Sequence, residues 1–376
     1  MRMSRDTSVL YGVARSVHEM KYRRWIPLRR PHNPGSQRPH TPTLAVMQEQ
    51  KRHHFVPGFY LNRFATESAR VLERRRDGVE FVTNTDNVAA ASGFYDITLP
   101  DGEKSKEVEN HLSRVEGQAA EVLRTIDTSL SAPPPGSEER TALSVYLGLQ
   151  MTRTRELREQ IQFPLKVAEF LGGRDLTHEL IAEFLEEIHL GFSPSEGEVK
   201  GAFDYSSFLL QDPPSMTRER SMEVMFNAAE AVAPRLTARN WCIEHDRKGR
   251  LVTSDTPLVL WRRPSPRDAY EGVGVEDADE IRFPFDPNKQ LIMTKRERSP
   301  STRISPERSA ACNQDVAFGC HNFVVAHPSQ QARVGRLDLP KRRPVLRFNS
   351  GPLLREQPDG TTIENGEVMH TWVPRR

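Results

Sequence analysis

The sequence predicts an α+β protein, in which a helical layer packs against a mostly antiparallel sheet. Residues Lys106 to Leu130 place apolar side chains at steps of three and four, which is typical of one face of a long helix. Further helical patterns fill the middle of the chain to Val232, whereas strand-like runs gather after Pro234. The strands and helices do not alternate along the chain, which argues against a doubly wound parallel sheet.

The composition limits the class of protein. The chain has 376 residues, of which 36% are hydrophobic and 28% charged, and its mean hydropathy is −0.62. These values are typical of a soluble protein with a modest core, and no run reaches the ~18 apolar residues of a membrane helix. Three cysteines are too few for a disulfide framework, so we expect a cytoplasmic protein with no membrane partner.

The chain divides into three parts. Residues 1–46 are rich in proline and hold nine basic and two acidic residues, so we expect a disordered leader, or translation that starts at Met47. A single α+β domain is expected over 47–340, followed by an Arg/Pro-rich tail over 341–376 that is mobile or adds a strand. Without the leader, 44 basic and 49 acidic residues remain, so net charge gives no argument for nucleic-acid binding.

Turn and cap signals set the limits of several elements. Asp77-Gly78 joins two β-like runs, 71–75 and 79–83, as a hairpin. Ser137 is the expected N-cap of a helix that runs to about Gln162, where Pro164 breaks or kinks the pattern. A basic turn with Gly249 predicts a second hairpin between 240–244 and 250–253. Helices are further predicted after Pro57 and over 177–190, 218–232 and 306–317, and strands over 258–261, 281–285, 290–294 and 322–326.

Two motifs give the chain a family resemblance. His53-His54-Phe55-Val56-Pro57 is followed by Phe59-Tyr60-Leu61, and Thr253-Ser254-Asp255-Thr256-Pro257 comes at the end of a predicted strand. Together they resemble the domain of unknown function 4238 family over roughly 51–328. The resemblance implies a fold and a set of clustered polar residues, with no settled biochemistry. Weaker agreement comes from 143–158, Trp241 and Asn313.

The motif residues are candidates for catalysis. His54 can act as a metal ligand or general base, and Asp255 as a carboxylate ligand or base with Ser254 as an assisting hydroxyl. The opening motif also resembles that of the His-Asn-His nucleases, but the later Asn and His of that pattern are not evident. The structural alternative is that His54 packs at the turn and that the short polar residues bond to nearby backbone amides.

A metal site and a substrate site can be assembled from these residues. His54, Glu116 and Asp255 are the candidate ligands of a divalent metal, Mg²⁺, Mn²⁺ or Zn²⁺. Glu116 shares a helix face with Glu109, and each is alternatively an ordinary flanking charge. Arg153 is the candidate for holding an anion, because a guanidinium binds phosphate bidentately. The remaining candidates for substrate binding are His53, Gln150 and Asn313.

Two functions of different classes follow. The first is a metal-dependent hydrolase that cleaves phosphodiesters in nucleic acid or another anionic substrate. The second is a non-catalytic interaction or binding protein, in which the His, Asp and Arg side chains form a structural network. An open pocket that gathers His54, Arg153 and Asp255 would favour the first, and scattered positions would favour the second. The oligomeric state is open.

Overall fold

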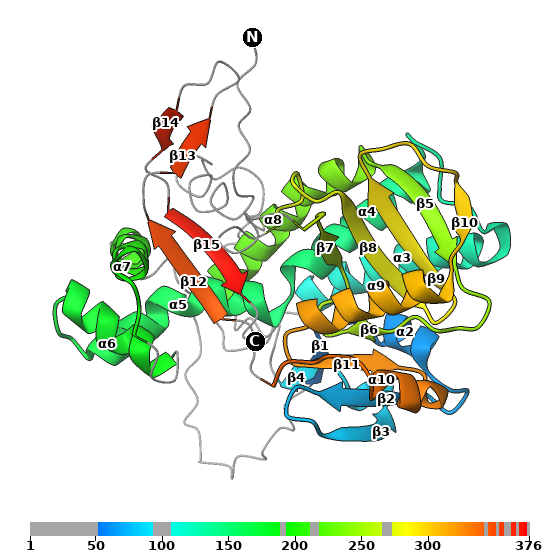
Figure 1. Ribbon diagram of the computed structural model, residues 1–376, viewed down its shortest axis with the longest axis horizontal. Helices are drawn as coiled ribbons and strands as arrows, with labels where there is room; N and C mark the ends of the chain where they lie inside the picture. The colour runs from blue at the N-terminus through cyan, green and yellow to red at the C-terminus, as the bar shows by residue number, and fades with distance from the viewer. Residues whose placement is uncertain are drawn as a thin grey trace, which may run out of the picture.

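The fold is described from a computed structural model. The described residues are 52–92, 107–188, 193–210, 218–264, 273–341 and four strands between 345 and 373. Helices form one layer over sheets that are almost entirely antiparallel, so the predicted α+β class is confirmed (Figure 1). Among the helices in these ranges, none has the length and apolar character that a bilayer crossing requires.

Three helices make the layer that covers the larger sheet. They are α3 (Glu107–Ser129), α4 (Glu138–Thr152) and α8 (Arg218–Thr237). The apolar stripe of 106–130 is therefore confirmed as one helix. Ser137 caps α4 as predicted, because its Oγ accepts a hydrogen bond of 3.1 Å from the backbone N–H of Arg140.

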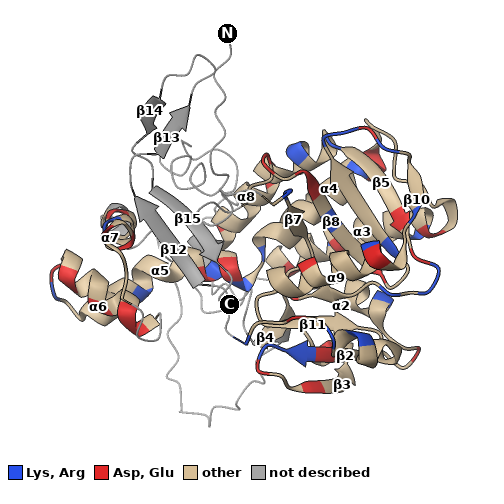
Figure 2. Cartoon of the chain, in the orientation of Figure 1, with Lys and Arg blue, Asp and Glu red and all other residues tan. Residues whose placement is uncertain are grey.

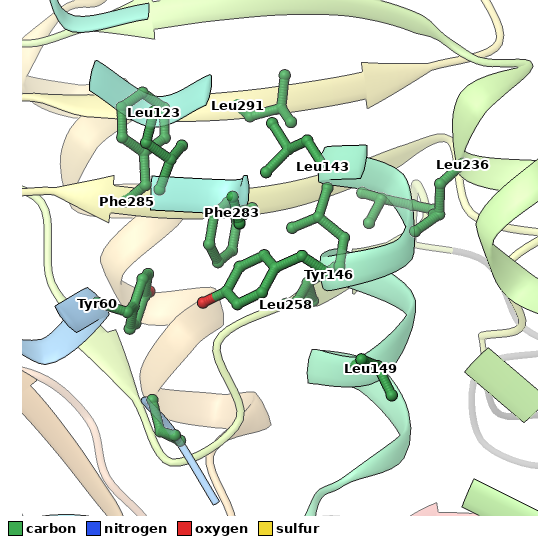
Figure 3. Packing of buried hydrophobic residues seen from close by; sticks show 14 of the residues in the cluster. Tyr60, Leu123, Leu143, Tyr146, Leu149, Leu236, Leu258, Phe283, Phe285 and Leu291 are labelled. Carbon is green, nitrogen blue, oxygen red and sulfur yellow. The ribbon is translucent and has the colours of Figure 1, made fainter. Parts of the chain in front are cut away.

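The larger sheet has the strand order β10-β5-β9-β8-β7. Only the β10–β5 pair is parallel among the described pairs of this sheet. Alternate side chains of its central strands, such as Phe283 and Leu291, pack against Tyr146 and Leu143 of α4 in the main core (Figure 3). The strands are β5 (Asn240–His245), β7 (Val259–Trp261), β8 (Glu280–Asp286), β9 (Lys289–Thr294) and β10 (Ser301–Arg303).

A second sheet has the strand order β3-β2-β11-β6 and lies below the first in Figure 1. The predicted hairpin is confirmed as β2 and β3, and Gly78 in its turn has the positive φ of 90° that favours glycine. Short elements surround this sheet, and β1 pairs with β4. The elements are β1 (Arg52–His54), β2 (Arg70–Arg75), β3 (Glu80–Asn84), β4 (Ala90–Ser92), β6 (Thr253–Ser254), β11 (Phe323–Ala326), α2 (Gly58–Leu61), α9 (Pro306–Gly319) and α10 (Gln331–Val334).

Three further helices pack on one another around a small apolar cluster that includes Phe163, Val167 and Phe184. They are α5 (Arg155–Leu171), α6 (His178–Ile188) and α7 (Glu196–Leu210), of which α7 was not predicted. The C-terminal tail contains more strands than the one considered. They form two antiparallel pairs, β12 (Val345–Ser350) with β15 (Val368–Val373) and β13 (Leu353–Glu356) with β14 (Thr362–Asn365). The leader over 1–46 and Met47 lie outside the described residues.

The prediction of one helix from Ser137 to about Gln162 is wrong. The chain forms two helices that meet at Arg153 and Thr154, and Pro164 lies inside the second one, α5. A proline cannot donate the usual hydrogen bond to the carbonyl four residues earlier. Here that carbonyl, of Gln160, accepts a hydrogen bond of 3.2 Å from the Tyr205 hydroxyl instead.

The predicted hairpin between 240–244 and 250–253 is also wrong. β5 pairs with β9 in the larger sheet, whereas β6 pairs with β11 in the other sheet. The turn around Gly249 therefore carries the chain from one sheet to the next. Local turn signals do not distinguish a hairpin from a turn that crosses between two sheets, because the true strand partners are distant in the sequence.

Replacing Gly148 with alanine is expected to destabilise the protein by ~1–3 kcal/mol. A Cβ atom at this position of α4 would lie 2.7 Å from the carbonyl oxygen of Ala229 on α8, so the helices would have to move apart. Gly117→Ala on α3 is the matched control, since nothing lies within 4 Å of its Cβ and alanine favours a helix by up to ~1 kcal/mol. Urea unfolding of both variants measures the difference; equal stabilities would contradict the close packing of α4 on α8.

Candidate functional site

The predicted site residues meet mainly around the junction between α4 and α5. Thr154 is the N-cap of α5, and its Oγ1 accepts a hydrogen bond of 3.2 Å from the backbone N–H of Leu157. A threonine at this position ends one helix and starts the next, because its side chain replaces the missing intrahelical acceptor. The break aims the side chains of consecutive residues at different elements.

Arg153, at the end of α4, is almost completely buried and 2% exposed. Its Nη1 lies 2.7 Å from Oε1 of Glu116 on α3. With its amide oxygen turned toward the guanidinium, Gln150 accepts from Nε and Nη2 of Arg153. The ring of Tyr146 lies 6.0 Å from the guanidinium carbon, on the same helix. The structure thus brings together the buried Arg153 and Gln150 with the half-buried Glu116 as a paired charge cluster.

The two adjacent histidines of the opening motif point to different partners. Nε2 of His53 lies 2.5 Å from Oε1 of Glu109, which is one of the two glutamates that α3 carries seven residues apart. Nε2 of His54 lies 3.3 Å from the carbonyl oxygen of Thr85, on the opposite side of the strand. This divergence follows from the alternation of side chains along β1. His53 therefore joins β1 to α3, whereas His54 faces the short turn at 85–87.

Asp255 lies where the chain leaves β6, and it is 3% exposed. Its Oδ1 accepts a hydrogen bond of 2.9 Å from the backbone N–H of His321, and its Oδ2 accepts one of 2.7 Å from that of Asn322. Burial raises the pKa of Asp255 to about 6, against the lowering effect of the His321 charge and these two N–H donors. Both carboxylate oxygens are used to hold the start of β11.

Ser254 closes the turn on itself. Its Oγ donates to the carbonyl oxygen of Thr256 at 2.9 Å and accepts from the Thr256 N–H at 3.1 Å. These are the local bonds that short polar residues form in turns.

His321 was not among the predicted site residues, yet it connects Asp255 to α5. Its Nδ1 lies 3.3 Å from Oε1 of Glu156, and its Nε2 lies 3.6 Å from Oε1 of Glu159. Burial opposes charge on the imidazole, but the contacts with the two glutamates outweigh it and raise the pKa of His321 to about 9. Arg155, the residue directly before Glu156, lies over the Phe55 ring at 4.9 Å, which joins α5 to the opening motif.

Asn313 is separated from this group. It lies on α9, where Nδ2 donates to the carbonyl oxygen of Arg250 at 2.7 Å and Oδ1 accepts from the N–H of Val252 at 3.1 Å. The side chain therefore supports the segment that crosses between the two sheets. These two hydrogen bonds give Asn313 a structural role that requires no ligand.

The residues proposed as metal ligands do not fit a metal site. Among the residues that the structure describes, no three His, Cys, Asp or Glu side chains are grouped so that they could hold a metal ion. His54 contacts Thr85, Glu116 is paired with Arg153, and both oxygens of Asp255 accept backbone N–H groups. The structure therefore does not gather His54, Glu116 and Asp255 around one point, and a bound metal stays a prediction.

The fold and the junction define an α+β protein whose motifs meet in a buried network of paired charges. A family model described as "Protein of unknown function (DUF4238)" matches residues 52–330, and the chain belongs to this family. The resemblance seen in the sequence is thereby confirmed. No curated protein and no solved structure matches the chain.

The network makes stability depend on pH through His321. Because its pKa in the folded protein, about 9, is above the ordinary 6.5, its stabilisation is complete below pH 6.5 and is lost as the pH rises through 9. The loss is on the order of 3 kcal/mol for a shift of this size. Asp255, with its raised pKa, loses stabilisation in a separate window, as the pH rises from about 4 to 6.

We therefore expect His321→Gln to flatten the fall in the free energy of unfolding between pH 6.5 and 9, measured by urea titration at several pH values. His327→Gln is the control, because His327 contacts Ser329 in a solvent-accessible turn, outside the junction. An unchanged pH profile in His321→Gln would show that His321 does not carry a charge held by α5.

Proposed function

We propose that this protein acts by binding a partner and not by catalysis, and that the cluster at the α4–α5 junction is structural. One observation carries the proposal: the predicted site side chains are engaged by groups of the protein itself, mostly from other elements. Five of them, namely Gln150, Arg153, Ser254, Asp255 and Asn313, are no more than 3% exposed.

The bonds of these residues support a structural role. A catalytic acid or base has to lie within hydrogen-bond reach of the substrate. Asp255 uses both oxygens on the backbone of residues 321 and 322, and Arg153 is neutralised by Glu116. Buried charges of this kind are retained where they are paired, because removing one partner leaves the other uncompensated.

Hydrolysis of phosphodiesters is the second candidate function. The observation in its favour is that burial and charge displace the pKa of Asp255 to about 6 and that of His321 to about 9, although the two residues are in contact. Strongly displaced pKa values gather at catalytic sites, although structural ion pairs displace them too. In this reading His321 would supply a proton and Arg153 would hold the anionic substrate.

The experiment that separates the two functions uses the full chain. Metal content is measured by mass spectrometry after incubation with Mg²⁺, Mn²⁺ or Zn²⁺, and hydrolysis is followed with bis(p-nitrophenyl) phosphate, labelled DNA and labelled RNA. We expect no stoichiometric metal and no hydrolysis. Asp255→Asn is expected to lower the free energy of unfolding by ~1–3 kcal/mol, because the amide oxygen can accept from only one of the two backbone N–H groups and leaves the other without an acceptor.

Asp86→Asn serves as the matched control, since Asp86 is an exposed aspartate in a short turn. Hydrolysis by the wild-type chain that is abolished in His54→Ala and in Asp255→Asn, while both variants remain folded, would contradict the binding function and favour the hydrolase.

A further inference from the structure

An exposed row of cations follows one edge of the larger sheet. It consists of Arg247, Lys248, Lys295, Arg296 and Arg303, all of which are exposed, and is called the basic rim below. We propose that the basic rim binds the phosphate backbone of nucleic acid without reading its sequence. This inference rests on the binding function proposed above and names its partner.

Strand register places the members of the basic rim along β5 and β10. Arg303 pairs with His245 at the end of β5, and Arg247 and Lys248 lie in the turn that follows. Lys295 follows Thr294, which pairs with Asn240 at the other end of β5. Figure 2 shows basic segments in the loops around these strands. Six strand residues cover ~20 Å, a length over which duplex DNA carries about twelve phosphate charges.

The charges of the basic rim are available to a ligand. None of its five side chains makes an ion pair with another residue in the described part of the chain. Two exposed carboxylates, Glu297 and Glu307, lie in the same segments and leave an excess of three positive charges.

Two buried carboxylates, Glu244 and Glu280, fix the segments that carry the basic rim. Arg298 spans Glu244 at 3.2 Å and Glu280 at 2.5 Å. Arg308 of α9 contacts the same two carboxylates at 3.2 and 2.7 Å. These bonds attach the loop after β9 and the start of α9 to the sheet, so the rim is ordered before a ligand arrives. Such preorganisation lowers the entropy cost of binding.

The chemistry favours nucleic acid over an anionic membrane surface. Proteins that lie on membranes insert exposed apolar side chains beside their cations. The large exposed apolar side chains of the described residues belong to other elements, and none lies in the basic rim: they are Val79, Val82, Leu130, Ile188 and Phe318. A row of unpaired cations without an apolar anchor matches a phosphate backbone.

The test measures how binding depends on salt. Fluorescence anisotropy with a labelled 20-base-pair DNA duplex gives the affinity of the full chain over a range of KCl concentrations. The rim variant combines Arg247→Gln, Lys248→Gln, Lys295→Gln and Arg296→Gln. The control variant removes four cations elsewhere, by Arg114→Gln, Arg124→Gln, Lys166→Gln and Arg263→Gln, so net charge and the basic leader are the same in both.

Each phosphate contact adds ~0.9 to the slope of log affinity against log salt. The rim variant is therefore expected to lose about 2 to 4 from that slope, whereas the control variant keeps the wild-type value. Equal losses in both variants, or no loss in the rim variant, would overturn the proposal. Rim-dependent flotation with phosphatidylserine vesicles, without rim-dependent DNA binding, would assign the surface to membranes and overturn it as well.

Failure of the inference and failure of the proposed function give different results. If the chain hydrolyses DNA and the rim variant still lowers the salt slope, the non-catalytic function fails and the rim stands. If the chain neither hydrolyses nor binds DNA through the rim, only the assignment of nucleic acid as the partner fails. In that case the charges serve to protect the short edge strand β10 from pairing with other chains.

Discussion

Two hydrogen bonds to the buried carboxylate of Asp255 hold the parts of this fold together. Asp255 lies after β6, where the chain returns from the smaller sheet toward β7 in the larger one. By accepting the N–H groups of His321 and Asn322, it fixes the start of β11 beside that crossing. The imidazole of His321 then reaches Glu156, so the same point also anchors α5. One carboxylate therefore ties the smaller sheet to α5, beside the segment that leads into the larger sheet.

The charges in this part of the fold are paired across different elements. Burying an ion costs several kcal/mol, which only close partners and further hydrogen bonds offset. Here α3 supplies Glu109 and Glu116, and α5 supplies Glu156 and Glu159, each to a basic group from another element. This arrangement explains how charged residues that resemble a catalytic group can instead specify how the elements fit together.

Local signals in the sequence predicted much of the fold. The apolar stripe of α3, the Ser137 cap and the Gly78 turn each act within a few residues, and each prediction is confirmed. The junction after Arg153 was missed because Thr154 interrupts a pattern that is helical on both sides. The pairing of β5 with β9 and of β6 with β11 was missed because strand partners distant in the sequence leave no local signal.

The candidate site was also predicted only in part, because residues close in the sequence could be linked by spacing and distant ones could not. Gln150 and Arg153 share a helix face, so their proximity could be read from spacing, and the structure adds Glu116 to them. His321 is a single histidine whose partner Glu156 lies 165 residues away, and no spacing rule connects them. Asn313 and His54 proved to contact other backbone segments, which only the three-dimensional fold reveals.

Amide hydrogen exchange at His321 and Asn322 tests the central role of Asp255 most directly. In the wild-type chain these two amides should exchange as slowly as the amides of the core strands, because both N–H groups donate to a buried carboxylate. In Asp255→Ala both amides should lose protection and exchange faster than Val324 and Val325 in the middle of β11. Equal protection of all four amides in the variant, or fast exchange of the two amides in the wild type, would contradict the account.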